Sequence, residues 1–221
     1  MNTNVKDRAY KKRPKKLKYG VGFCKDDYRT SNKFTGWYYP YYRAWNSILQ
    51  RCYSKTLHKK HPTYKTVSVC EDWLNFHKFK DWMEGQNWEG MDLDKDVLSV
   101  ITGEKVYSPD NCAFISRELN SFFTLRQNHR GDYPLGVTYK KSGRNIKRYI
   151  ARLNKPDGRV LLGYFHTASE AHSAYQLAKW KYGQELLQQQ TDPRIIQAMH
   201  VILHNLGNDW AAGRETKTLT I

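Results

Sequence analysis

The chain has 221 residues and a formal net charge of +16 at pH 7. Such a positive excess indicates a polyanionic partner, with nucleic acid ahead of a membrane surface. No apolar run approaches the roughly 20 residues that span a bilayer, and the basic N-terminus lacks the apolar segment of a secretory signal. We therefore expect an intracellular protein without a membrane partner, built as one large domain or two to three small ones.

Residues 1–18 carry eight Lys and Arg residues against one Asp and have almost nothing apolar to bury. This composition predicts a disordered basic arm. Two roles remain open for it: contact with phosphates that does not depend on base sequence, or a solubilising tail.

Two amphipathic helices are predicted next, with a short strand at residues 67–70 between them. The first helix, residues 41–53, has apolar side chains at i, i+3, i+4 and i+7: Trp45, Ile48, Leu49 and Cys52. The second helix, residues 71–83, has a buried side formed mainly by aromatic residues: Trp73, Phe76, Phe79 and Met83.

The four cysteines are far apart in the sequence and form no C-x-x-C pair: Cys24, Cys52, Cys70 and Cys112. Structural zinc sites usually have closely spaced ligand pairs. The spacing therefore favours buried free thiols over a zinc site.

The central stretch, residues 91–123, combines two periodicities. Three aspartates alternate at its start: Asp92, Asp94 and Asp96. Alternation predicts a strand, a turn follows at Gly103, a second strand begins at Asn111, and helical spacing begins at Ser116. A strand–loop–strand–helix layout can hold a divalent metal between a strand carboxylate and a helix side chain.

Four segments of residues 41–123 carry a family resemblance. They read W-N-S-I-L-Q-R-C-Y (45–53), V-C-E-D-W (69–73), L-D-K-D (93–96) and V-Y-S-P-D-N-C (106–112). Together they resemble the bacteriophage HNH homing endonucleases, which cut DNA with a ββα-metal module and one Mg²⁺ or Mn²⁺ ion. The resemblance implies an HNH-like module at residues 19–124. It also implies that Asp94 and Asn120 are the metal ligands and that Asn111 holds the loop between the two strands by hydrogen bonds.

One position departs from that family. Lys95 stands where the family usually has its general-base histidine, and an ordinary lysine is protonated at neutral pH. Three interpretations remain open. Lys95 is deprotonated through burial; it contacts phosphate while water, the metal or another histidine handles the proton; or the site is degenerate and only binds DNA. Asp92 and Asp96 are predicted to share the strand face of Asp94, as substitute ligands or solvated carboxylates.

After a polar linker, residues 125–135, a second module is predicted at residues 136–190. Strands are expected at 136–139, 148–154 and 160–165, with turns between them. A helix begins at Ala168, where Thr167 and Glu170 form a capping box. The sequence thus predicts a three-stranded antiparallel sheet packed on one helix.

This second module has its own resemblance, carried by G-V-x-Y, Y-I-A-R-L, L-L-G-Y-F-x-T and E-A-x-x-A-Y between residues 136 and 182. It resembles the plant ethylene-response-factor (APETALA-type) DNA-binding domain, whose exposed sheet face enters the major groove. The resemblance implies a DNA-binding face formed by Thr138, Lys140, Arg144, Arg148, Arg152 and Arg159. These arginines either grip guanine, at about 1–3 kcal/mol each, or contact only phosphate. Leu161 replaces a base-contacting Trp of the family and Arg152 a frequent Glu, so the plant target sequence is not transferred.

In the last part, residues 191–221, Asp192 and Pro193 begin a helix that is expected to end near Gly207. The predicted fold is therefore α+β: a ββα-metal module, a three-stranded sheet with one helix, and a C-terminal helix.

The leading hypothesis for function is a homing or nicking DNA endonuclease that binds double-stranded DNA as a monomer or weak dimer, in the host cytoplasm during phage infection. The first alternative is a catalytically degenerate HNH-like protein that binds DNA as a regulator or architectural factor. The second is an RNA or ribosome binder.

Overall fold

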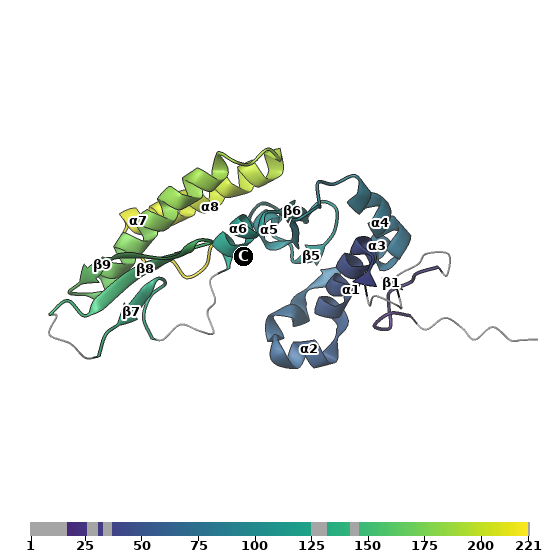
Figure 1. Cartoon of the computed structure of the whole chain (residues 1–221), viewed down its shortest axis with the longest axis horizontal. Coiled ribbons are helices and arrows are strands. Elements are labelled where there is room, and N and C mark those ends of the chain that lie inside the picture. The colour runs from purple at the N-terminus through teal and green to yellow at the C-terminus, as the bar shows by residue number, and fades with distance from the viewer. Residues whose placement is uncertain (1–16, 26–30, 33–36, 125–131, 142–145, 221) are drawn as a thin grey trace, which may run out of the picture.

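The computed structural model describes residues 17–25, 31–32, 37–124, 132–141 and 146–220, and Figure 1 shows its α+β architecture. Helices α1–α4 form one end of the molecule, the sheet β7–β9 with α7 forms the other, and β4–β6 with α5 and α6 lie between them. None of the helices in these ranges is long and apolar enough to cross a membrane. The predicted basic arm falls outside the described ranges, apart from its last two residues.

The elements fall into three consecutive groups. The first group is β1 (Ser31–Asn32), β2 (Trp37–Tyr38), α1 (Pro40–Tyr53), α2 (Lys55–Lys60), the 3₁₀ helix η1 (Pro62–Thr66), β3 (Ser68–Val69), α3 (Glu71–Leu74) and α4 (Phe76–Glu84). The second is β4 (Asp92–Asp94), α5 (Asp96–Thr102), β5 (Val106–Tyr107), β6 (Ala113–Ile115) and α6 (Arg117–Phe123). The third is β7 (Val137–Tyr139), β8 (Tyr149–Lys155), β9 (Gly158–Phe165), α7 (Ala168–Leu187) and α8 (Pro193–Ala211).

Helix α1 confirms the predicted apolar stripe, because its four buried residues are the four that the spacing indicates. The helix predicted at residues 71–83 is instead two helices, α3 and α4, separated at Asn75. The Phe23 N–H donates to the Leu74 carbonyl oxygen (2.8 Å) and the Phe76 N–H donates to the Phe23 carbonyl oxygen (2.9 Å). Phe23 thus satisfies the backbone carbonyl and N–H groups on either side of the break. The Asn75 side chain caps α4 by accepting from the His77 N–H.

The central stretch contains a strand–strand–helix unit. Strand β4 pairs antiparallel with β6, with Asp94 opposite Ala113, and α6 follows β6 directly. The expectation that Asp96 lies on the strand face was wrong, because Asp96 begins α5. The Asp94 carboxylate accepts hydrogen bonds from the N–H groups of Asp96 (2.9 Å) and Val97 (2.8 Å). These bonds satisfy free donors at the start of α5, and Val97 is fully buried beneath that turn.

The three-stranded antiparallel sheet is confirmed, in the order β7–β8–β9 with a β-bulge at Ala151/Arg152. Helix α7 packs on the sheet and begins at the predicted cap. The Thr167 side chain accepts from the Glu170 N–H, while the Glu170 carboxylate accepts from the His166 N–H. The C-terminal helix α8 begins at Pro193 as predicted but runs past Gly207 to Ala211.

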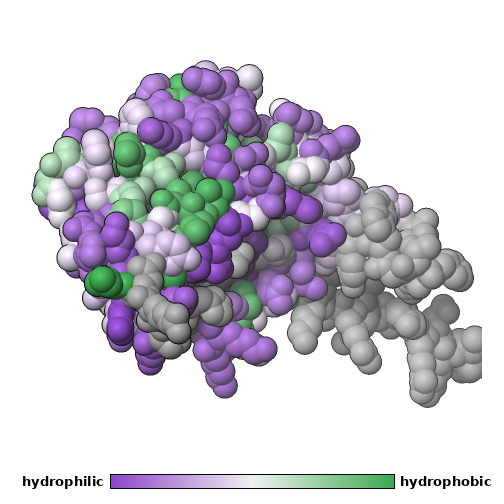
Figure 2. All heavy atoms as spheres, turned by 60° about the vertical axis from the view of Figure 1, so that its left-hand side comes forward, coloured by the Kyte–Doolittle hydropathy of each residue, from purple (hydrophilic) through white to green (hydrophobic). Residues whose placement is uncertain are grey.

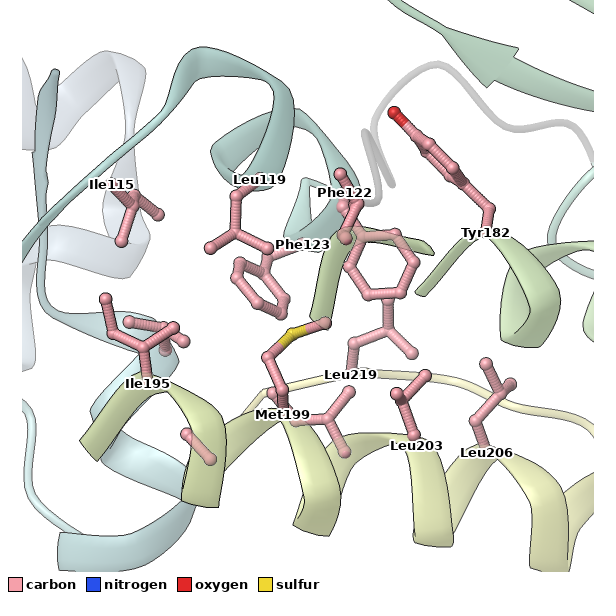
Figure 3. Close-up of a cluster of buried hydrophobic side chains, with 14 of the residues drawn as sticks. Ile115, Leu119, Phe122, Phe123, Tyr182, Ile195, Met199, Leu203, Leu206 and Leu219 are labelled. Carbon is pink, nitrogen blue, oxygen red and sulfur yellow. The ribbon is translucent and has the colours of Figure 1, made fainter. Parts of the chain in front are cut away.

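One hydrophobic core joins the second and third groups. It contains Leu119, Phe122 and Phe123 from α6 together with residues of α5, β8, α7, α8 and the C-terminal segment. Figure 3 shows Met199 and Leu203 of α8 directed toward the phenylalanines of α6. Residues on both sides of the predicted 125–135 linker therefore share one core. A second core joins α1, α3 and α4 with Tyr107 of β5 and Cys112.

Two polar contacts reinforce the junction between α6 and α7. The Lys179 ammonium, only 5% exposed, donates to the Phe122 carbonyl oxygen at 2.6 Å. Burial lowers the pKa of Lys179 to about 7. The Tyr182 hydroxyl donates to the Glu118 carboxylate at 2.7 Å. Both hydrogen bonds fix the position of α6, the helix that carries Asn120, against α7.

Candidate active site and binding surface

An open cavity of about 680 Å³ lies between α1, β4 and α6. We call it the cleft. Asp92, Asp94 and Asp96 contribute carboxylates to its lining, and Asn120 contributes an amide from α6. The cleft thus brings the two predicted metal ligands, Asp94 and Asn120, to one place.

Asp94 lies at the end of β4, and one of its carboxylate oxygens accepts the two N–H groups that cap α5. Burial raises the pKa of the Asp94 carboxyl, and the negative charge of Asp96 raises it further. The backbone N–H bonds and Lys95 act in the opposite direction without cancelling the rise. A positive ion bound at this carboxylate would offset both the cost of burying the negative charge of Asp94 and its repulsion by Asp96.

Asn120 is positioned by Asp92. Its side-chain nitrogen donates to the Asp92 carboxylate at 3.1 Å, which leaves the amide oxygen to accept from another group. Asp92 and Asp94 are two residues apart on β4, so they lie on the same face of the strand. Asp92 therefore lies beside both predicted metal ligands, Asp94 and Asn120. Asp96 also lines the cleft, but it belongs to α5.

The donor set fits a hard divalent cation. Mg²⁺ is usually held by one or two carboxylates together with waters and substrate phosphate, and Mn²⁺ also prefers oxygen ligands. Asp92, Asp94 and the amide oxygen of Asn120 are ligands of this kind. Within the described ranges, no three or more His, Cys, Asp or Glu side chains form a group that could hold a metal ion.

Lys95 does not line the cleft. It is 5% exposed, its ammonium pairs with the Asp96 carboxylate, and it lies 5.9 Å from the centre of the Tyr107 ring. The residue at the predicted base position is therefore packed behind the site. Among the described residues that line the cleft, none is a histidine. His129 belongs to residues 125–131, which the structure does not describe.

Asn111 also lies outside the cleft and is almost completely buried. Its backbone N–H donates to the Ser108 hydroxyl, and its side-chain nitrogen donates to the Glu104 carboxylate at 3.0 Å. Both partners belong to the segment between α5 and β6, so the hydrogen bonds of Asn111 stabilise the conformation of this loop.

Three basic residues of the cleft were missed as site candidates. Arg43 and Arg51 come from α1, and Arg117 comes from α6. The spacing of Arg43 and Arg51, i and i+8, was visible in the sequence as a polar face of the first helix. That this face would lie opposite the β4 carboxylates was not visible, because it depends on how α1 packs against the rest of the fold.

The predicted DNA-binding face is largely exposed. The Arg152 guanidinium donates to the Thr138 hydroxyl (3.0 Å), and the Arg159 guanidinium donates to the Asn154 side-chain oxygen (3.1 Å). Lys140 and Arg148 are exposed at the β7–β8 end of the sheet. Arg144 lies outside the described residues.

Large apolar side chains lie among these cations. Leu161, 50% exposed, pairs with Arg152 across the sheet, and Tyr164 is 39% exposed. The three strands contain no Asp or Glu. Figure 2 brings this end of the molecule forward and shows hydrophobic residues bordered by hydrophilic ones. The surface combines cations with apolar contact area, and the only acidic residue in its β8–β9 hairpin is Asp157, in the turn.

All four cysteines are free thiols. Cys52 and Cys112 are buried, as predicted, whereas Cys24 and Cys70 are partly exposed. Burial raises the pKa of the Cys52 thiol to about 12, despite the nearby positive charges of Lys95 and Arg51. Cys52 is therefore an unreactive core residue.

Comparison with protein-family models, curated proteins and solved structures found no match for this chain.

Proposed function

We propose that this chain is a phage-type DNA endonuclease of the homing or nicking class, with an HNH-like site in the cleft. The observation that carries the proposal is the meeting of Asp94 and Asn120, from a strand and a helix, at one cleft that also contains guanidinium groups. The resemblance of residues 41–123 to HNH homing endonucleases supports the same assignment. Duplex DNA would bind across the β7–β9 sheet and extend to the cleft.

In this proposal Asp94 and Asn120 hold one Mg²⁺ or Mn²⁺ ion. When bound, such an ion offsets charge on the scissile phosphate and on the leaving oxygen. Asp92 holds the Asn120 amide through the 3.1 Å hydrogen bond to its nitrogen, so the amide oxygen is the atom that would bind the ion. Asp94 is held by α5 through the two N–H groups that it caps.

The proton of the attacking water needs an acceptor other than Lys95, since Lys95 is buried behind the cleft and paired with Asp96. Asp92 is the cleft carboxylate that neither caps a helix nor pairs with Lys95 in the described structure. We assign it the role of proton acceptor, directly or through solvent.

The test is cleavage of supercoiled plasmid by the purified chain with Mg²⁺, with Mn²⁺ and with EDTA. Asp94→Asn is the informative variant, because it removes the charge and keeps an oxygen that can cap α5. Asp110→Asn, an exposed loop change outside the cleft, is the matched control. We expect metal-dependent nicking that Asp110→Asn retains and Asp94→Asn loses.

The second candidate is a DNA-binding protein that has lost catalysis. It is favoured by one specific observation: Lys95, at the position of the family's general base, is buried, and none of the described residues that line the cleft is a histidine. A gel shift with duplex DNA but no cleavage under either metal would select this candidate. Cleavage that persists in Asp94→Asn would exclude the proposed site.

A further inference from the structure

Arg51 is a half-buried cation at the wall of the cleft. One of its terminal nitrogens donates to the Tyr107 hydroxyl at 3.1 Å. No acidic side chain of the described ranges forms an ion pair with it. A guanidinium has five N–H donors in a planar fork, and Tyr107 accepts only one of them. The rest of the fork has no acidic partner among the described residues and can donate to an anion that enters the cleft.

The surroundings keep this guanidinium charged. Burial disfavours the charge, but the Tyr107 hydroxyl, Tyr64 and the Asp94 carboxylate outweigh it, and the pKa of Arg51 is raised. Tyr107 is itself only 2% exposed and belongs to β5, so the acceptor that orients Arg51 is fixed in the core.

Two other α1 side chains share the face of Arg51. Arg43, Ser47 and Arg51 recur every four residues, and all three line the cleft. They provide two guanidiniums and a hydroxyl on one wall, and the wall that includes Asp92, Asp94 and Asn120 belongs to β4 and α6. Such a cleft suits an anion that binds guanidiniums on one side and a metal ion on the other. A phosphodiester is an anion of this kind.

We infer that this face of α1 is a phosphate-binding site, in which Arg51, assisted by Arg43 and Ser47, grips the non-bridging oxygens of the phosphodiester to be cut. The inference rests on the proposed function and adds a catalytic residue to it. Arg51 contacts the substrate, and Tyr107 is a positioning residue that holds the fork in the cleft. The alternative is that Arg51 only ties α1 to β5.

The first test does not depend on cleavage. Inorganic phosphate is added to the full chain labelled with ¹⁵N-arginine, and the side-chain N–H resonances are followed by NMR. We expect saturable shifts of the Arg51 resonance, and a phosphate affinity on the order of tenfold weaker in Arg51→Gln. Lys181→Gln, which removes one exposed charge from α7, should bind phosphate like the wild type. An unmoved Arg51 resonance, or unchanged affinity in Arg51→Gln, would overturn the inference.

The second test separates catalysis from a structural role. In single-turnover cleavage, Arg51→Gln should lose on the order of 10²–10³ in rate, with duplex affinity within about threefold because the sheet supplies most DNA contacts. Arg43→Gln changes an exposed residue and should lose rate without loss of melting temperature. Tyr107→Phe should lose less rate than Arg51→Gln.

A normal cleavage rate in Arg51→Gln and Arg43→Gln would refute the phosphate site while leaving the endonuclease in place. A wild-type chain that cuts no DNA would instead refute the proposed function, and the phosphate titration would still decide whether α1 forms an anion site.

Discussion

The cleft and the β7–β9 sheet both carry arginines, but they hold them differently. In the cleft, the candidate side chains are fixed by hydrogen bonds to residues of other elements or to the backbone: Arg51 by Tyr107, Asn120 by Asp92, and Asp94 by the first turn of α5. On the sheet, Arg152 and Arg159 donate to neighbouring polar side chains, Thr138 and Asn154, at the exposed surface. The proposed function requires fixed groups in the cleft, because catalysis depends on a fixed geometry of the reacting groups.

The two regions nevertheless share a scaffold. Helix α6, which carries Asn120, and α7, which supports the sheet, are buried in the same core. We therefore expect that substitutions in the cleft change cleavage and substitutions in the sheet change DNA binding, whereas both regions unfold together.

A core substitution should damage both regions together. Leu203 of α8 is 2% exposed within the shared core. Leu203→Ala should lower the free energy of unfolding by about 2–5 kcal/mol, measured by urea denaturation with probes in both modules. Leu161→Ala, at an exposed sheet position, is the control and should stay within about 0.5 kcal/mol. Separate transitions for the two modules would contradict a shared core.

A cleft substitution should affect cleavage alone. Asn120→Ala removes a proposed metal ligand and the donor to Asp92. We expect a loss of cleavage rate of about 100-fold or more, with duplex affinity in EDTA unchanged. Ser121→Ala, one residue further along α6 and exposed, serves as the control. Equal losses in the two variants would show that damage to α6, not loss of a ligand, causes the effect.

A sheet substitution should affect binding alone. Arg152→Gln should weaken duplex binding by about 1–3 kcal/mol if the guanidinium reads a guanine, and cleavage at saturating protein should match the wild type. Titrations at several salt concentrations separate the two roles of the arginine. If Arg152 contacts only phosphate, its loss should lower the magnitude of the slope of log affinity against log salt by about one and should weaken binding to all sequences alike. Unchanged affinity for every duplex would remove Arg152 from the interface.

The junction between α6 and α7 should make stability depend on pH. The pKa of Lys179 is about 7 in the folded chain and near 10.4 in an unfolded one. Between these values the unfolded chain binds one more proton, so stability should rise with pH, by up to about 1.4 kcal/mol per pH unit. Lys179→Met should lose that slope between pH 7.5 and 9. A slope that persists in the variant would assign it to other groups.

Local patterns in the sequence were sufficient for several elements. The four buried residues of α1 follow from their spacing, and the start of α7 follows from Thr167 and Glu170. The three strands of the sheet were also predicted, because turn residues separate them. In each case the signal lies within one segment of the chain.

Features that depend on distant contacts were not predicted. The break at Asn75 requires Phe23, and the burial of Lys95 requires Tyr107 and Asp96. Asp96 was placed on the strand because alternation does not reveal that Asp94 caps a helix. The place of Arg51 in the cleft depends on the packing of α1 in the fold, which no local pattern encodes.

The most direct test of the division between the cleft and the sheet is single-turnover nicking of supercoiled plasmid with Mn²⁺ at saturating protein, comparing Asp94→Asn with Arg152→Gln. The account predicts that Asp94→Asn binds the plasmid and does not nick it, while Arg152→Gln nicks it at the wild-type rate once saturated. Nicking by Asp94→Asn at the wild-type rate would contradict the account, because the chemistry would then lie outside the cleft.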